Sequence, residues 1–271
     1  MSNDLTVVLQ QAAIIAKGLD DDTKAVAGGM QNFRISIAGG TFRMIVNGKE
    51  QASIEDRSMS VIFVKMAHKP SRTFYVDAYK EGSKTSPACW SSDSVNPDPE
   101  VTSPVASNCA SCPNSIKGSG QGGVGSACRL SWRTAVVLPQ QVDGPVYQLV
   151  LPATSTFGEE DNGRWPFRSY VQMLASHNVS GGAVITKMQF DTKAKVPRVL
   201  FSPAGAVKAE DMETIRSQGL SPAALNAVKM TVYQSDSSPE EPVRREVNQA
   251  PQVDTPTDPA SLVKKWARKS A

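Results

Sequence analysis

The chain has 271 residues, of which 40% are hydrophobic, so it can form one large domain or two small ones with an ordinary core. No stretch approaches the about 18 consecutive apolar residues of a membrane span, which predicts a soluble, cytoplasmic protein with no membrane partner. The 29 basic and 26 acidic side chains give a net charge of +3, which permits nucleic-acid binding without requiring it. The sequence has no P-loop, G-x-S-x-G or H-E-x-x-H motif, which argues against the enzymes that those motifs serve.

Residues 1–30 form a candidate N-terminal helical segment. Apolar residues recur at helical spacing from Leu5 to Ala16, behind a potential N-cap at Asn3 or Asp4. We expect the apolar face of this helix to cover the body of the protein or a second copy of it. A homo-oligomer is therefore one expectation.

From Phe33 the apolar period changes to two, which is typical of strands. Alternation at 33–37 and 42–46, closed by Asn47-Gly48, predicts a hairpin, and further strands are expected at 59–66 and 73–79. Beyond the cysteines we expect a strand at 134–138, its hairpin partner at 146–151, a helix at 168–176 and a closing hairpin at 184–190 and 196–201. The predicted fold class is mainly β (α+β), with about seven or eight strands around one central helix.

All four cysteines, Cys89, Cys109, Cys112 and Cys128, lie in one short part of the chain. Cys109 and Cys112 form a C-x-x-C pair, whose spacing lets two thiolates reach one tetrahedral ion. The chain between the cysteines is rich in Gly, Ser and Pro and cannot bury enough apolar surface to order itself. A structural zinc ion bound by the four cysteines is therefore the leading prediction.

Alternatives to a four-cysteine zinc site remain. Two disulfides would need an oxidising compartment, yet residues 1–17 lack the basic start and cleavage site of a signal peptide. A redox-active C-x-x-C lacks the expected βαβ surroundings. His68 could replace an outer cysteine as a ligand, although a lone histidine beside Lys69 and Pro70 is more typical of a solvated loop.

The C-terminal part has a different composition. Helices are predicted at 208–218 and 222–229, within a segment of residues 206–233. From residue 234 to residue 271 the chain is rich in Ser, Pro, Glu, Gln and Thr, which predicts a disordered tail. The tail ends in a short basic segment around Trp266, which could fold on a partner.

The sequence offers little catalytic machinery. The two histidines, His68 and His177, have no nucleophile or base motif around them. A zinc ion held by four thiolates has no open position for water. The H-x-E element of zinc deaminases is also missing before the C-x-x-C pair. We therefore predict a binding protein, not an enzyme.

The cysteine region carries a family resemblance. The layout Cys89-Trp90-Ser91-Ser92-Asp93, Pro97-Asp98-Pro99, Cys109-x-x-Cys112-Pro113 and Cys128-Arg129 resembles zinc-loop proteins of tailed bacteriophages. Those are similar to phage single-stranded DNA-binding proteins, in which a zinc-stabilised loop is built onto an OB-type β-barrel. The resemblance implies an OB-like barrel at 31–205 with a zinc loop at 86–130, in a protein that coats or protects single-stranded DNA during replication or recombination in the host cytoplasm.

Aromatic side chains alternate with cations on the strands beside the cysteines, a combination that can stack bases and neutralise phosphates. The predicted phosphate contacts are Lys65, Lys69, Arg72, Lys80, Arg129 and Arg133, and the predicted stacking residues are Tyr75, Tyr79, Trp90 and Trp132. Replication or recombination proteins are possible partners of the tail. However, the tail ends in Lys264, Lys265, Arg268 and Lys269, where phage and bacterial single-strand binders commonly carry an acidic tip.

Two other functions fit the same pattern. The chain could be a zinc-stabilised structural or interaction module, for example a virion or replisome scaffold that ignores oligonucleotides. It could also be an accessory factor that acts on duplex DNA.

Overall fold

The computed structural model describes residues 8, 9, 12, 23, 32–76, 87–120, 123 and 125–230, and nearly all of them form one β-rich body. The predicted N-terminal helix falls almost entirely outside this part, and the tail from residue 234 falls wholly outside it. All described residues belong to one structural unit, Met1–Ser237.

Ten strands form the sheet, in the path β10-β9-β4-β7-β8-β1-β2-β3, with β5 and β6 attached beside β7. Every pair is antiparallel except β1 and β8. The strands are β1 (Phe33–Ser36), β2 (Phe42–Val46), β3 (Lys49–Ile54), β4 (Ser58–Met66), β5 (Ser71–Phe74), β6 (Cys89–Ser91), β7 (Arg129–Val137), β8 (Tyr147–Pro152), β9 (Val184–Phe190) and β10 (Val199–Ala206).

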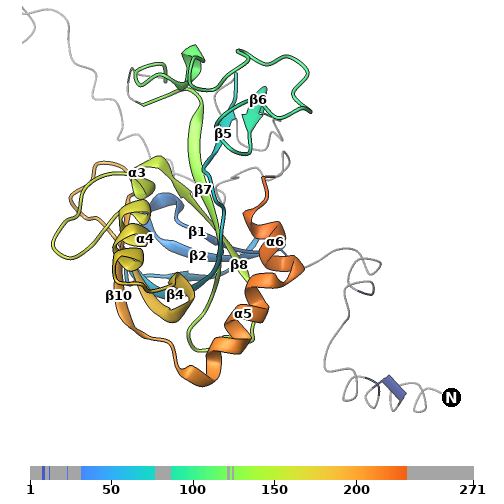
Figure 1. Ribbon diagram of the computed structural model, residues 1–271, viewed down its shortest axis with the longest axis vertical. Helices are drawn as coiled ribbons and strands as arrows, with labels where there is room; N and C mark the ends of the chain where they lie inside the picture. The colour runs from blue at the N-terminus through green and yellow to red at the C-terminus, as the bar shows by residue number, and fades with distance from the viewer. Residues whose placement is uncertain are drawn as a thin grey trace, which may run out of the picture. The chain divides into compact units, whose positions relative to one another are not determined.

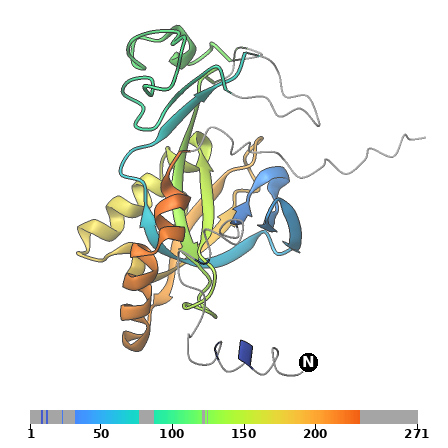
Figure 2. The same cartoon turned by 90° about the vertical axis from the view of Figure 1, so that its right-hand side faces the viewer.

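The sheet curls into a half-barrel (Figure 2). The first half of β4 pairs with β9 and its second half with β7. The pairing with β7 contains a register shift between Phe63 and Lys65, and such bulges bend a strand. The curl brings distant strands together: the rings of Phe42 on β2 and Phe190 on β9 lie 4.5 Å apart, although four strands separate them along the path. The predicted mainly β class is therefore confirmed.

The main core fills the inside of the curl. Helix α4 (Phe167–Ser176) packs Phe167, Tyr170 and Leu174 into it. The buried Tyr170 hydroxyl hydrogen-bonds the Thr186 hydroxyl at 2.8 Å, which satisfies both polar groups. The short helix α3 (Ala153–Thr156) follows β8 on the same side (Figure 1).

A second, smaller core lies on the other face of the sheet, under helices α5 (Met212–Leu220) and α6 (Pro222–Val228). Strand β7 serves both cores, because Val136 belongs to the first while Ala135 and Val137 belong to the second. The side chain of Ser221 caps α6 by accepting a hydrogen bond from the amide of Ala224. This alternation along β7 determines which of its other side chains are accessible.

The short 3-10 turns connect these elements. They are η1 (Ala38–Gly40), η2 (Pro113–Ser115), η4 (Gly181–Ala183) and η5 (Ala209–Asp211).

Candidate nucleic-acid interface and cysteine site

Strand β7 extends beyond the half-barrel and carries a small sheet with β5 and β6 (Figure 1). Its first residues pair with β5, and β5 pairs in turn with the short strand β6. The loop of residues 92–127, which we call the cysteine loop, joins β6 to β7. The base of this loop is thus held by sheet hydrogen bonds that continue from the body.

Local hydrogen bonds shape the cysteine loop. Asp98 accepts hydrogen bonds from the amide and the hydroxyl of Ser92, at 2.9 and 2.6 Å. The Cys109 amide donates to the carbonyl of Val95 at 2.9 Å, and the Cys128 amide donates to the carbonyl of Asn114 at 2.7 Å. These bonds bring the C-x-x-C turn next to the loop's two ends, where Cys89 and Cys128 lie.

The four cysteines form the interior of this region. All four are buried and none is in a disulfide. Between residues 92 and 128, the buried described residues are Val101 and three of the cysteines. The four cysteines line one small cavity of about 10 Å³. This volume is close to the about 10–15 Å³ that one water molecule needs.

Electrostatics link the cysteines to Arg72. Burial raises the pKa of Cys109, and it raises the pKa of Cys128 to about 11, so both thiols are protonated at neutral pH. The charge of Arg72 lowers the pKa of both thiols and so opposes burial. Arg72 also lines the cysteine cavity, and its buried Nε has no hydrogen-bond partner among the described residues. A cation in the cavity would favour the thiolate forms further.

The residue types around the cysteine cavity suit a zinc ion, but the arrangement of their side chains does not. Four buried thiols around one cavity, with a neighbouring guanidinium, suit a Zn²⁺ ion, whose complex with four thiolates carries net negative charge. Yet in the described part of the chain, no group of three or more His, Cys, Asp or Glu side chains is arranged so that it could hold a metal ion. Zinc binding would thus require the sulfurs to move closer together, to about 2.3 Å from a common centre.

Strand register separates the predicted DNA contacts onto two faces of the small sheet. Thr73 lies directly between Trp90 on β6 and Arg129 on β7. Residues directly opposite each other in a sheet share a face, so these three side chains form one row, with Tyr75 two residues further along the chain. We call the face that carries Thr73, Tyr75, Trp90 and Arg129 the aromatic face. Arg72 and Cys89 belong to the opposite face and line the cysteine cavity, which Trp90 also borders.

Two of the predicted contacts are used inside the body. Lys65 is partly buried, and its Nζ donates to the carbonyl of Gly219 on α5 at 3.2 Å. The Trp132 ring packs against Phe167 at 5.7 Å, and its indole N–H donates to the carbonyl of Ala67 at 2.7 Å. Because β7 alternates, Trp132 faces the main core while Arg129 and Arg133 face the other way. The structure therefore separates Trp132 from the arginines with which the sequence analysis grouped it.

The remaining predicted contacts fall in three places. Lys69 is exposed and forms an ion pair with Asp93 at 3.4 Å. Arg133 is only 5% exposed and lines a second cavity, next to Lys69. Tyr79 and Lys80 lie outside the described residues.

Sequence reasoning missed Ser71, Ser92 and Lys229, which line that second cavity with Lys69 and Arg133. Ser71 and Ser92 sit near predicted contacts and were within reach of a pattern search. Lys229 follows a helix far along the chain, and no sequence signal brings it to β7.

The histidines do not join the cysteines. His68 is exposed at the turn between β4 and β5. The His177 ring nitrogen Nδ1 lies 2.9 Å from the carbonyl of Met173 at the end of α4. The prediction that the chain is not an enzyme stays a prediction.

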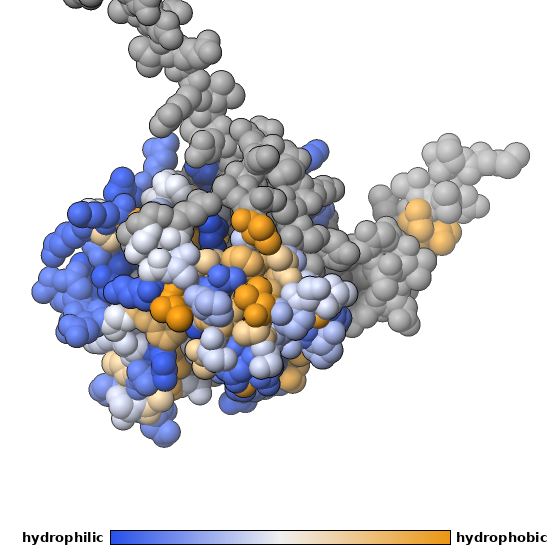
Figure 3. All heavy atoms as spheres, turned by 90° about the horizontal axis from the view of Figure 1, so that it is seen from above, coloured by the Kyte–Doolittle hydropathy of each residue, from blue (hydrophilic) through white to orange (hydrophobic). Residues whose placement is uncertain are grey.

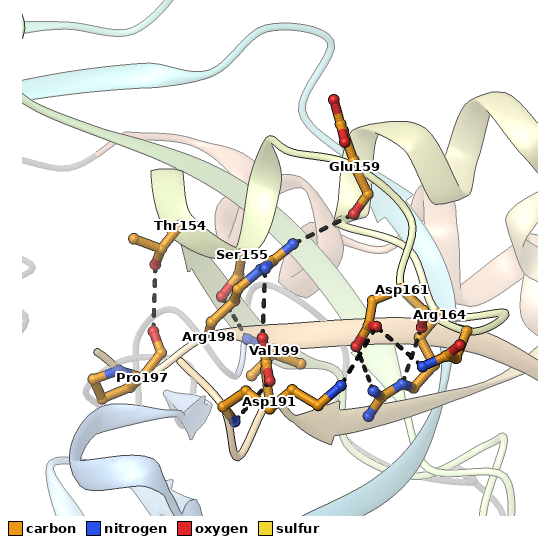
Figure 4. A network of polar contacts seen from close by, with 11 residues as sticks. Thr154, Ser155, Glu159, Asp161, Arg164, Asp191, Pro197, Arg198 and Val199 are labelled. Carbon is orange, nitrogen blue, oxygen red and sulfur yellow. Dashed lines mark hydrogen bonds and ion pairs between the residues drawn. The ribbon is translucent and has the colours of Figure 1, made fainter. Parts of the chain in front are cut away.

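A network of charged side chains lies at another end of the body. At the end of the body where β9 meets β10, Arg198 lies 3.4 Å from Asp191, whose side chain is 7% exposed (Figure 4). Arg164 bonds Asp161 at 2.7 Å in the same network. Figure 3 looks onto the end that carries the cysteine loop and shows hydrophobic residues scattered among hydrophilic ones. Among the described residues of this loop, the exposed large apolar ones are Val95, Val105 and Ile116.

Comparisons of the chain with protein-family models, curated proteins and solved structures find no match. Among the described residues, no helix combines the length and the apolar character needed to cross a membrane. The function therefore has to be inferred from side-chain geometry.

Proposed function

We propose that this protein binds single-stranded DNA across the aromatic face, beside a cysteine loop that is held together by a structural zinc ion. One observation carries the proposal: the register of β5, β6 and β7 places Trp90, Thr73 and Arg129 in one row. Arg129 is exposed, and Trp90 and Tyr75 are partly exposed. Rings that accept stacked bases beside a cation that attracts phosphate are typical of sequence-tolerant single-strand binding.

The fold is part of the same proposal. OB folds are five-stranded, partly open Greek-key barrels, whereas this sheet follows a longer open path of strands. We interpret the half-barrel as an elaborated OB-like barrel, in which β5 and β6 extend the curved surface. Recruitment of replication or recombination proteins by the tail remains a prediction, because the tail lies outside the described residues.

Zinc would be held by Cys89, Cys109, Cys112 and Cys128. Bound there, zinc would take the place of a hydrophobic core in the loop. It would also tie Cys89, at the start of β6, to Cys128, directly before β7. Arg72, which already lines the cavity, would balance part of the negative charge of the thiolates. In this role zinc is structural and takes no part in chemistry.

The experiment is a titration of tryptophan fluorescence with oligo-dT at low salt. Trp90→Phe should remove most of the quenching, while Trp132→Phe should leave it, since Trp132 lies in the core. Stacking contributes about 1–3 kcal/mol per base, so Trp90→Ala should weaken binding by about 5–150-fold. Because Trp90 also lines the cysteine cavity, the exposed Arg129→Gln is the second variant.

Quenching that is absent at low salt, or that is equal in both Phe variants, would refute the aromatic face as the binding site. Competition with duplex DNA and RNA would show the preference among nucleic acids. Binding without salt dependence would also contradict the proposal, because phosphate contacts release counterions.

The alternative of a structural or interaction module also has an observation behind it. Val95, Val105 and Ile116 are exposed on the cysteine loop, with 41%, 42% and 60% of their surface accessible. If the protein is an interaction module, the double variant Val105→Ser/Ile116→Ser should lose binding to its protein partner. If the protein binds single-stranded DNA across the aromatic face, the same variant should bind oligo-dT as the wild type does. A zinc-loaded protein that ignores all oligonucleotides would favour the module.

A further inference from the structure

The second cavity has a volume of about 210 Å³ and lies where β7 emerges from under α6. Its polar lining consists of Lys69, Ser71, Ser92, Arg133 and Lys229. Three of these side chains are cations and two are hydroxyls, and none of the residues that line the cavity is a carboxylate. This composition differs from that of the network around Arg198, where Arg198 and Arg164 each lie beside an aspartate.

The fold explains why the cavity is there. Arg129, Ser131, Arg133 and Ala135 alternate along the same face of β7. Helix α6 covers Ala135 in the second core and ends at Val228, so the position of Arg133 falls at the edge of this cover. The turn after β4 and the start of β5 supply the opposite wall, and the Ser71 hydroxyl on β5 donates to the carbonyl of Ser131 at 3.4 Å.

Arg133 is a built part of the cavity and not a surface charge. Only 5% of its surface is exposed, so the surrounding residues hold its guanidinium in place at the cavity. A planar guanidinium with several donors suits an oxyanion, and lysine ammonium groups and serine hydroxyls are common donors to phosphate oxygens. Asp93 is not part of the lining, but it lies 3.4 Å from Lys69 and offsets part of the positive charge there.

We propose that this cavity binds a phosphate group. Its volume exceeds by many times the about 10–15 Å³ that one water needs, and it is smaller than the about 300–1,000 Å³ of pockets for larger ligands. The phosphate comes either from the backbone of a bound DNA strand or from a free phosphate or nucleotide. The first source rests on the proposed function, and the second does not.

Continuity with the aromatic face favours the strand as the source. Arg129 and Arg133 are four residues apart on one strand, so about 13 Å of β7 separates them. One face of β7 thus leads from the row of Trp90, Thr73 and Arg129 to the cavity. A strand whose bases stack on Trp90 can place a phosphate in the cavity without leaving this face.

The test uses the full chain and two probes, inorganic phosphate and oligo-dT. The lysines are exposed, so Lys69→Gln/Lys229→Gln should fold normally, and Lys187→Gln, an exposed lysine on β9, is the matched control. We expect inorganic phosphate, against chloride at equal ionic strength, to shift the amide NMR signals of Ser71, Ser92 and Lys229 in the wild type and in Lys187→Gln. The double variant should lose these shifts. Arg133→Gln should lose them as well if it folds.

Oligo-dT then identifies the source. Each phosphate contact contributes about 0.7 to the slope of log K against log salt for single strands. If the strand supplies the phosphate, oligo-dT displaces inorganic phosphate and the double variant has a salt slope that is smaller by about 0.7. If phosphate binds but oligo-dT binding is identical in the double variant and the control, the site takes a free phosphate.

Two further outcomes separate this inference from the proposed function. If no phosphate-dependent shifts appear and the oligo-dT salt slopes of both variants are equal, the inference is overturned and the proposed function stands. If the protein binds phosphate but no oligo-dT, the phosphate site stands and the proposed function is overturned.

Discussion

The body of the protein and the cysteine loop are ordered by different means. The body buries large apolar side chains between a curled sheet and α4, among them Phe42, Phe63 and Tyr170. The cysteine loop buries mainly sulfur, since Val101 and three cysteines are the buried described residues at 92–128. Area burial supports the first region whatever the solution contains. We expect the order of the second region to depend on what its thiols bind.

This contrast also separates the proposed binding residues. Trp132 and Lys65, which the body uses, make their contacts inside the fold. Trp90 and Arg129 are on the small sheet at the base of the cysteine loop. Stability and binding should therefore be separable by single substitutions, and the loop should be separable from the body.

Metal removal should have the largest effect on the loop. Binding of a structural zinc contributes about 10–16 kcal/mol in small zinc domains. Cys112→Ser, or chelation, should lower the zinc stoichiometry and remove hydrogen-exchange protection from the amides of Cys109 and Cys128, while the body keeps its melting temperature within a few degrees. The control is Ser111→Ala, an exposed neighbour on the same turn.

Two results would break this part of the comparison. Unchanged zinc content in Cys112→Ser would show that the ligand set is wrong. Loss of protection in β4 and β8 together with the loop would show that the two regions unfold as one.

Truncation of Trp132 should instead act on the body. Its ring packs on Phe167, so Trp132→Ala should reduce the free energy of unfolding by about 3 kcal/mol, the lower end for a large aromatic residue that is partly buried. Trp132→Phe keeps a ring but loses the bond to the carbonyl of Ala67, at a cost of about 1 kcal/mol. Urea denaturation measures both. A variant with normal stability and impaired oligo-dT binding would place Trp132 at the DNA instead.

Gly219 tests how closely α5 lies on the sheet. A Cβ at this position would lie 2.5 Å from the carbonyl oxygen of Val64, so the helix must shift to accept it. We expect Gly219→Ala to cost about 1–3 kcal/mol by overpacking, and to weaken the bond between Lys65 and this turn. Ser217→Ala, an exposed position on the same helix, should have no such effect. Thermal unfolding that is equal for the two variants would contradict the packing.

Much of the body was predictable because its signals are local. The Asn47-Gly48 pair forms the hairpin turn with φ of 50° and 79°, as the dipeptide predicts. The alternation at 33–46 and the helical period at 168–176 correspond to β1, β2 and α4. Strand β3 was missed because Lys49–Ile54 is polar and almost fully exposed, which leaves no apolar period to detect.

The candidate site was predictable in composition more than in arrangement. The clustering of the cysteines in sequence predicted four ligands of one zinc ion, which stays a prediction; the structure lines one cavity with all four. The alternation rule applied to 129–133 already places Trp132 opposite to Arg129 and Arg133, so this separation was within reach of the sequence. The engagement of Lys65 by Gly219 was not, because 154 residues separate the two partners. The same holds for Lys229 in the second cavity.

Asp93 gives the smallest effect and tests what orders the start of the loop. Its pKa is lowered from 3.8, chiefly by the hydrogen bond from the Val95 amide at 2.8 Å, with smaller contributions from Lys69 and Ser91. A lowered folded-state pKa means that the carboxylate stabilises the fold fully above pH 3.8, and that this stabilisation is lost as pH falls through the lowered value. The Asp93 side chain is 45% exposed, so solvent screens the effect.

The order of these causes can be measured directly by an NMR titration of the Asp93 carboxyl. Because the amide is the main cause, Lys69→Met should retain most of the depression of the pKa, and added salt should change it little. A pKa that returned to 3.8 in Lys69→Met would show that the ion pair, not the backbone, holds the carboxylate. In that case the start of the loop would be ordered by surface charge, and the loop would depend on ionic strength as well as on its thiols.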